Sequence, residues 1–85
     1  MSNSNILEII VTGSSRGIGR YITTHLLEKG YKVIGISRKD QSIDNKNFFH
    51  IKADLTNNSD IENLKLKIDS FQNIYGLINN AGTAS

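Results

Sequence analysis

Short apolar runs alternate along this chain with longer stretches in which apolar residues recur at helical spacing. The run at 6–11, broken only by Glu8, is rich in β-branched residues and too short for a helix, so it predicts a strand. Similar runs at 31–36, 48–52 and 74–78 predict three more strands. Glycines and clusters of Asn, Ser and Asp separate these segments, and the chain contains no proline.

The stretch after the first strand predicts an amphipathic helix. Ile18, Ile22 and Leu26 fall at i, i+4 and i+8, which places them on one helical face and predicts that this face is buried. Gly30, directly after Lys29, is predicted to end the helix because glycine readily adopts the left-handed conformation of a helix C-cap.

The stretch before the fourth strand predicts a second helix. Ser59 and Glu62 have the spacing of a capping box, and Asp60 adds negative charge to the first turn. A second apolar stripe follows at helical spacing, formed by Ile61, Leu64, Ile68 and Phe71. The polar segment 37–46 predicts a loop, with a helical turn at 40–45 as an alternative.

The order of these elements predicts the fold class. Strands that alternate with helices and have near-continuous apolar character are typical of a parallel sheet covered on both faces. Right-handed crossovers then restrict the topology to a Rossmann-like, doubly wound α/β sheet. Four strands correspond to the N-terminal half of such a sheet, in the order 3-2-1-4, and residues 1–85 form a partial dinucleotide-binding domain.

Composition narrows the class of protein further. The net charge of +2 is too small and too scattered for a nucleic-acid-binding surface, and no apolar run approaches the roughly 18 residues of a membrane helix. The absence of Cys excludes a disulfide framework and thiolate metal sites, and no pair of His or carboxylate residues has metal-ligand spacing. We therefore expect a cytoplasmic protein with no metal site, no nucleic-acid partner and no membrane partner.

A Gly-rich segment between the first strand and the first helix carries the main candidate chemistry. It consists of Thr12, Gly13, Ser14, Ser15, Arg16, Gly17, Ile18 and Gly19. A helix N-terminus has unpaired N–H groups and a positive dipole end, and glycines allow the backbone to approach a pyrophosphate. The seryl hydroxyls can add donors. The segment therefore predicts a phosphate-binding loop, with a plain turn before a helix as the alternative.

The segment resembles the TGxxxGxG motif of the short-chain dehydrogenase/reductase family, and most closely its 3-oxoacyl-(acyl-carrier-protein) reductases. Its spacing differs from the G-x-G-x-x-G fingerprint, and it lacks the Lys-Ser/Thr of a P-loop. The resemblance implies an NAD(P)-dependent oxidoreductase that reduces a carbonyl or oxidises an alcohol. A 3-oxoacyl thioester is one implied substrate.

Two cationic residues follow the second strand, where the adenosine ribose lies in dinucleotide folds. Ser37, Arg38 and Lys39 place a planar guanidinium there, with no acidic residue before Asp40. An Arg at this point suits the 2′-phosphate of NADP(H), and Arg16 is a second cation for it. We therefore expect NADP(H) to be favoured over NAD(H), with a solvated loop pair as the alternative reading of Arg38 and Lys39.

Two later segments match the family in order and spacing. The resemblance implies that Asp54 and Leu55, after the third strand, contact the adenine, whereas a turn before the second helix is the alternative. After the fourth strand comes an Asn-Asn-Ala-Gly segment that the resemblance places beside the cofactor ribose, with a strand-ending turn as the alternative. Its proposed contact residues are Asn80, Ala81 and Gly82.

The catalytic residues that the resemblance implies have no counterpart here. The family uses a Ser, an Asn and a Tyr-x-x-x-Lys pair, and none of the three tyrosines is followed four positions later by Lys. We therefore expect the chain to be the N-terminal part of a longer reductase, inactive alone, whose missing part contacts the substrate and forms a homo-oligomer. The alternatives are a catalytically inactive dinucleotide-binding module and a half-domain that binds nothing and pairs through its open sheet edge.

Overall fold

The computed structural model describes residues 6–80 of the chain, and the predicted order of strands and helices is confirmed. The elements are β1 (Glu8–Thr12), α1 (Gly17–Glu28), β2 (Lys32–Ser37), β3 (Phe48–Lys52), α2 (Asn58–Ile68) and β4 (Ile74–Asn79). The C-terminal end of each strand lies within one residue of the predicted one, and β1 begins two residues later than predicted. Segment 40–45 contains no helical turn.

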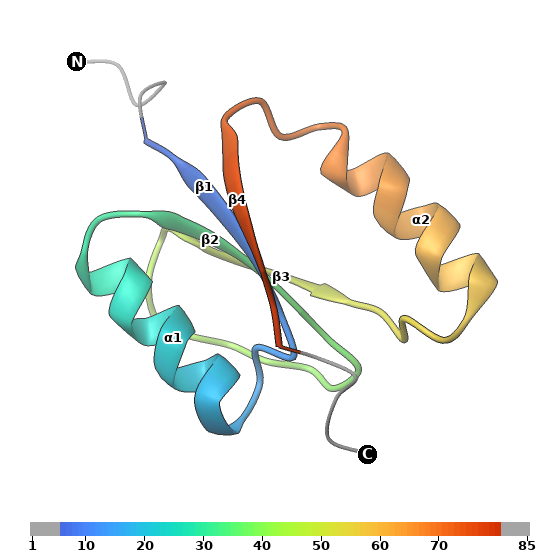
Figure 1. Cartoon of the computed structure of the whole chain (residues 1–85), viewed down its shortest axis with the longest axis horizontal. Helices are drawn as coiled ribbons and strands as arrows, with labels where there is room; N and C mark the ends of the chain where they lie inside the picture. The colour runs from blue at the N-terminus through green and yellow to red at the C-terminus, as the bar shows by residue number, and fades with distance from the viewer. Residues whose placement is uncertain (1–5, 81–85) are drawn as a thin grey trace.

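The four strands (Figure 1) form one parallel sheet. Their order is β3-β2-β1-β4, which confirms the Rossmann-like topology. Thr12 at the end of β1 pairs with Ile36 in β2 and with Asn79 at the end of β4. The carboxyl ends of the strands therefore meet at one edge of the sheet, where ligands bind in open α/β folds.

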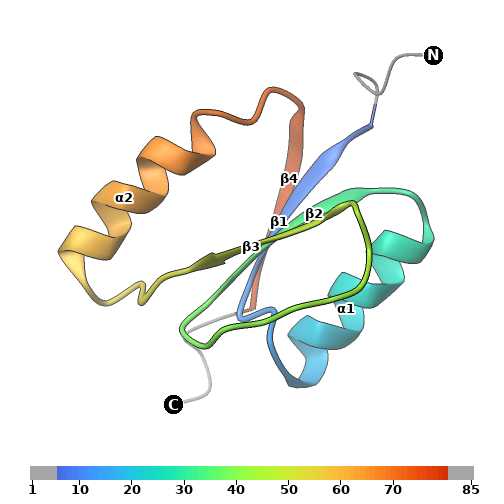
Figure 2. The ribbon, with the colours of Figure 1, turned by 180° about the vertical axis from the view of Figure 1, so that it is seen from behind.

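The two faces of the sheet carry separate cores because successive strand residues point to opposite faces. One core lies between the sheet and α1 and consists of Ile9, Val11, Leu27 and Val33. The other lies between the sheet and α2 and consists of Ile10, Ile34, Ile36, Ile51, Ala53 and Leu64. As predicted, the two helices lie on opposite faces of the sheet (Figure 2). Ile68 and Phe71 are partly buried and pack against the second core.

The predicted buried face of α1 is confirmed in part. Ile22 and Leu26 are partly buried and pack against the core on this side of the sheet, whereas the predicted burial of Ile18 is wrong. Ile18 is 69% exposed, and the buried positions are Gly19, Thr23 and Leu27. Two of these buried residues, Gly19 and Thr23, are small. Gly19 lies against the Gly-rich loop, and Thr23 Oγ1 donates to the Gly19 carbonyl at 2.8 Å. A search for large apolar side chains does not detect such a face. The predicted C-terminal glycine is confirmed, with Gly30 at φ +95°.

The predicted capping box of α2 is also wrong. The N-cap is Asn57, whose side-chain oxygen accepts from the Asp60 amide at 2.9 Å, and Ser59 lies inside the helix. Asp60 does lie in the first turn, and its carboxylate accepts a hydrogen bond from the Asp54 amide at 2.8 Å. This contact to the preceding turn fixes where the helix begins.

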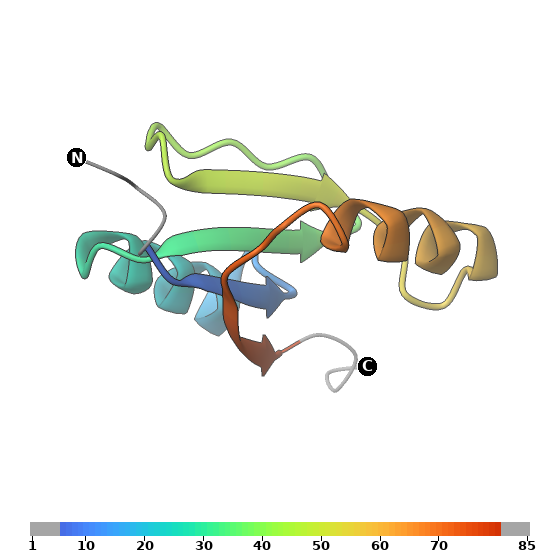
Figure 3. The same cartoon turned by 90° about the horizontal axis from the view of Figure 1, so that it is seen from above.

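β4 lies at the edge of the sheet within the described part of the chain (Figure 3). It carries large exposed apolar side chains, with Tyr75 at 68% and Leu77 at 63% exposed, and Leu66 on α2 is 72% exposed. The open, apolar edge expected from the sequence is therefore present among residues 6–80.

Candidate functional site

The Gly-rich loop joins the end of β1 to the start of α1. Gly13 and Gly17 have φ angles of +67° and +59°, in the left-handed region that favours glycine. The Gly13 amide donates to the Ile36 carbonyl at 2.8 Å, which ties the start of the loop to the end of β2. The loop thus turns sharply at the carboxyl edge of the sheet.

Gly19 allows α1 to lie close to this loop. A Cβ at Gly19 would lie 2.7 Å from Asn80 Nδ2 and well inside van der Waals contact with the Gly13 carbonyl oxygen. Asn80 Nδ2 also donates to that carbonyl at 3.3 Å. The absence of a side chain at Gly19 is therefore required by packing of the protein on itself.

The N-terminus of α1 is open to an anion, in contrast to that of α2. Arg16 is the N-cap of α1 and makes no side-chain cap hydrogen bond, and the first turn contains no acidic residue. The first turn of α2 has both an N-cap, Asn57, and an acid, Asp60. A Cβ at Gly17 would meet no protein atom within 4 Å. The positive end of the α1 dipole therefore faces free space that a phosphate can occupy.

Residues at the ends of β1 and β4 are joined by side-chain hydrogen bonds. Thr12 Oγ1 donates to Asn79 Oδ1 at 2.9 Å and accepts from the Asn80 amide at 2.9 Å. This network lies at the point where the strand order reverses, the usual site of ligand binding in such sheets. Asn80 is thus placed beside the Gly-rich loop, whereas Ala81 and Gly82 lie outside the described residues.

The two loop serines have different surroundings. The Ser14 side chain is fully buried, and its hydroxyl donates to Gln41 Oε1 at 2.8 Å, so this hydroxyl is directed to the protein instead of to a ligand. Ser15 is half-buried. Sequence reasoning missed Gln41, because a polar residue within a polar loop gives no signal.

The end of β2 is anchored by hydrogen bonds around Ser37. Its hydroxyl donates to the Lys39 carbonyl at 2.8 Å and lies 2.6 Å from His50 Nε2. Burial lowers the pKa of His50 below its ordinary 6.5, with Asp40 acting in the opposite direction. This contact of His50 was also missed.

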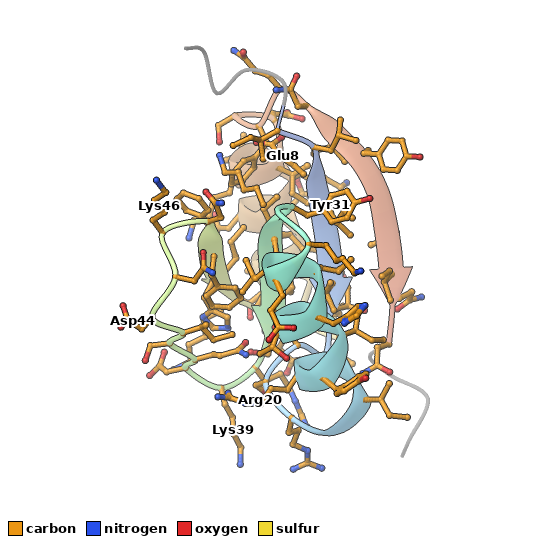
Figure 4. All side chains as sticks on the ribbon, turned by 90° about the vertical axis from the view of Figure 1, so that its left-hand side faces the viewer. Glu8, Arg20, Tyr31, Lys39, Asp44 and Lys46 are labelled. Atoms are coloured by element: carbon orange, nitrogen blue, oxygen red, sulfur yellow. The ribbon has the colours of Figure 1, made fainter. Side chains whose placement is uncertain are left out.

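The cationic side chains that follow Ser37 are exposed. Arg38 and Lys39 are both exposed, as is Arg16 in the Gly-rich loop. Figure 4 shows Lys39 and Arg20 at the same end of the molecule, whereas Lys46 lies at the opposite end of the 38–47 loop. Positive charge therefore gathers where the α1 N-terminus is open.

Asp54 and Leu55 follow β3 at the same edge of the sheet. Asp54 Oδ1 accepts from the Thr56 hydroxyl at 2.7 Å and from the Thr56 amide at 2.9 Å, and these bonds lower the pKa of Asp54. The half-buried Asp54 is therefore an ionised acceptor at neutral pH. Leu55 is 37% exposed. Asp54 thus forms the turn before α2 that the sequence offered as the alternative. The contact of Asp54 with an adenine stays a prediction.

The described residues also bear on metal-binding and membrane-spanning classes of protein. Between residues 6 and 80 no group of three or more His, Cys, Asp or Glu side chains is arranged to hold a metal ion. In the same part of the chain no helix is long and apolar enough to cross a membrane.

Comparison with known proteins places the chain in a family. Residues 8–85 match the family model described as short chain dehydrogenase. Among curated proteins, the chain is 38% identical over 79 residues to the 3-amino-tetrahydro-pyrrolizinone reductase of Xenorhabdus hominickii, covering 87% of this chain and 28% of that protein. It is 30% identical over 84 residues to the NADPH-dependent pterin aldehyde reductase of Arabidopsis thaliana, covering 88% and 35%.

Solved structures share the fold. A short chain dehydrogenase family protein from Francisella tularensis subsp. tularensis SCHU S4 superposes with a TM-score of 0.78 at 40% identity, covering 91% of this chain and 31% of that one. A closed form of serine dehydrogenase complexed with NADP+ gives 0.75 at 29% identity, covering 89% and 34%. A 4-hydroxyisoleucine dehydrogenase complexed with NADH and succinate gives 0.72 at 29% identity, covering 87% and 34%.

The parallel sheet, the Gly-rich turn and these matches together define the class: this chain belongs to the short chain dehydrogenase family. It spans about a third of the length of the curated relatives it matches.

Proposed function

We propose that this chain is the cofactor-binding part of an NADP(H)-dependent oxidoreductase that interconverts a carbonyl and an alcohol. The observation that carries the proposal is the N-terminus of α1, which has no side-chain cap and no acid and is preceded by glycines in the left-handed conformation. A pyrophosphate supplies the negative charge that this helix end lacks. The site fits the group, because a Cβ at Gly17 would meet open space.

In the proposed site, residues at the ends of different strands contact different parts of the cofactor. Amides of the first turn of α1 hold the pyrophosphate, and the exposed Arg16 and Arg38 hold a 2′-phosphate. Asp54 and Leu55 receive the adenine, and the segment beginning at Asn80 lies along the ribose. When bound, the nicotinamide supplies the hydride, and the role of these residues is to bind and orient it.

The preference for NADP(H) rests on Arg38. After the end of β2, no acidic residue stands before Asp40, which lies two residues beyond Arg38. Relatives are named for NADPH, and solved relatives hold NADP+ or NADH, so likeness alone does not choose between the cofactors. The cationic strand end of this chain favours the phosphorylated one.

The remaining parts of the proposal concern the whole protein. Relatives named for different carbonyl compounds support the reaction class, and a 3-oxoacyl thioester is one candidate substrate that rests on the loop resemblance alone. We propose a cytoplasmic homo-oligomer in which residues outside this chain provide catalysis and substrate contacts. The second candidate function is an inactive dinucleotide-binding module, which uses the same cofactor site and differs from the enzyme in having no turnover.

Isothermal titration calorimetry of the complete protein with NADPH and NADH tests the proposal. Saturable binding that is tighter for NADPH supports it. A folded protein that binds neither dinucleotide contradicts it. Turnover of NADPH with an aldehyde or ketone then separates the enzyme from the inactive module.

A further inference from the structure

The segment that carries Arg38 is anchored at both of its ends. At one end, the buried Ser37 hydroxyl donates to the Lys39 carbonyl at 2.8 Å and is held by His50. At the other end, Gln41 is bound to the Gly-rich loop. The exposed residues between these anchors therefore extend from a short, fixed stretch of backbone.

Gln41 makes two hydrogen bonds to a single residue of the Gly-rich loop. Gln41 Oε1 accepts from Ser14 Oγ at 2.8 Å, and Gln41 Nε2 donates to the Ser14 carbonyl at 2.9 Å. The two bonds use both ends of the amide, so they fix its orientation as well as its distance.

Ser14 is itself rigidly held. Its side chain has no exposed surface, and a Cβ at Gly35 of β2 would lie 2.5 Å from Ser14 Oγ. The space above Gly35 is thus filled by the hydroxyl that binds Gln41. Gln41 therefore joins the 38–47 loop to one of the best-packed points of the fold.

We propose that Gln41 is a positioning residue for cofactor selection, which fixes Arg38 relative to the Gly-rich loop so that both loops act on one 2′-phosphate. This inference rests on the proposed function. Arg16 lies on one loop and Arg38 on the other, so a shared phosphate requires a defined distance between the loops. Because Gln41 holds the loop in place before the cofactor binds, less conformational entropy of the loop is lost on binding.

The test compares dinucleotide affinities of the complete protein with those of Gln41→Met, which removes both hydrogen bonds at similar side-chain volume. We expect the dissociation constant for NADPH to rise about tenfold, the effect of about one net hydrogen bond, and that for NADH to change less than about twofold. Gln72→Met, at an exposed glutamine after α2, is the matched control and leaves both constants unchanged. An equal loss for both dinucleotides, or no loss, overturns the inference.

Two further measurements keep the inference testable if Gln41→Met folds poorly or if no dinucleotide binds. Ser14→Ala removes one of the two bonds, and we expect an intermediate loss of affinity that is selective for NADPH. Unchanged selectivity overturns the inference.

Limited trypsin digestion of the ligand-free protein is the second measurement, because trypsin cleaves after exposed residues such as Arg38 and Lys39. We expect faster cleavage there in Gln41→Met than in Gln72→Met, and equal rates overturn the anchoring role independently of any cofactor. Failure of the proposed function is seen separately, as a wild-type protein that binds neither dinucleotide.

Discussion

Gly19 in the first turn of α1 faces the carbonyl of Gly13 so closely that no side chain fits between them. The two residues lie at opposite ends of the Gly-rich loop, and Asn80 Nδ2 donates to the same carbonyl at 3.3 Å. The helix N-terminus, the end of β1 and the end of β4 therefore meet at one point. This contact fixes where an anion could approach the helix.

Gly19→Ala is expected to destabilise the protein by about 2–3 kcal/mol, because the new methyl group meets backbone that cannot move away. Urea denaturation measures the loss. Gly76→Ala is the control, since a Cβ there meets nothing within 4 Å, and it should leave stability nearly unchanged. Equal denaturation midpoints for the two variants would contradict the close packing of Gly19.

Gly17→Ala is expected to weaken NADPH binding at least about tenfold, because its methyl group enters the space proposed for the pyrophosphate. Its positive φ adds strain of about 1–2 kcal/mol. Gly30→Ala has the same kind of backbone strain and equally open surroundings at the other end of α1. Calorimetric titration should therefore show that Gly30→Ala binds NADPH normally, and a similar loss in both variants would assign the effect to strain.

Arg38→Asp should reduce the preference for NADPH over NADH about tenfold or more, because it removes a cation from the 2′-phosphate and adds a like charge. Lys46→Asp changes a charge at the far end of the same loop and should leave the preference intact (Figure 4). The ratio of the two dissociation constants is the measurement. An unmoved ratio in Arg38→Asp would show that the guanidinium does not contact the phosphate.

Asn57→Ala should cost about 1 kcal/mol of unfolding free energy, since it removes the side-chain acceptor for the Asp60 amide. Ser59→Ala, at an exposed position inside α2, should cost little. Denaturation midpoints compare the two variants. A larger loss from Ser59→Ala would restore the capping box that the sequence predicts.

Acidification below about pH 6.5 should lower the stability of the protein through His50. Burial lowers the native pKa of His50 below 6.5, so the unfolded chain takes up a proton that the native imidazole resists. The free energy of unfolding therefore falls as the pH drops from 6.5 through the native pKa. Asp54 adds its own loss only below its ordinary 3.8. His50→Gln should flatten the stability profile in the upper range, and an unchanged slope would contradict the assignment.

The sequence predicts the sheet well because its signals are local. Runs of β-branched residues give the strands, and the glycine after Lys29 gives the end of α1. The order of the strands then follows from crossover handedness. The Gly-rich turn is recognisable for the same reason, because its signals lie within eight residues. Gly13 and Gly17 have positive φ angles, and Gly19 lies close to the backbone of Gly13.

The errors arise where contacts are distant or small residues form the contact. Ile18 is a large apolar residue at the start of α1, yet it is exposed and Gly19 is the buried residue. The helix lies closer to the Gly-rich loop at Gly19 than a side chain allows. Three cap-forming residues stand in a row at 57–59. Hydrogen bonds of Asn57 and Asp60 to the turn at Asp54 accompany the choice of Asn57, and the residue types alone do not reveal them. Gln41 meets Ser14 across 27 positions, a pairing that no periodicity encodes.

The structure of the complete protein crystallised with NADPH tests the central claim most directly. We expect pyrophosphate oxygens within about 3 Å of amide nitrogens in the first turn of α1, and the 2′-phosphate beside Arg38. A dinucleotide bound elsewhere, with the N-terminus of α1 facing only water, would contradict the account.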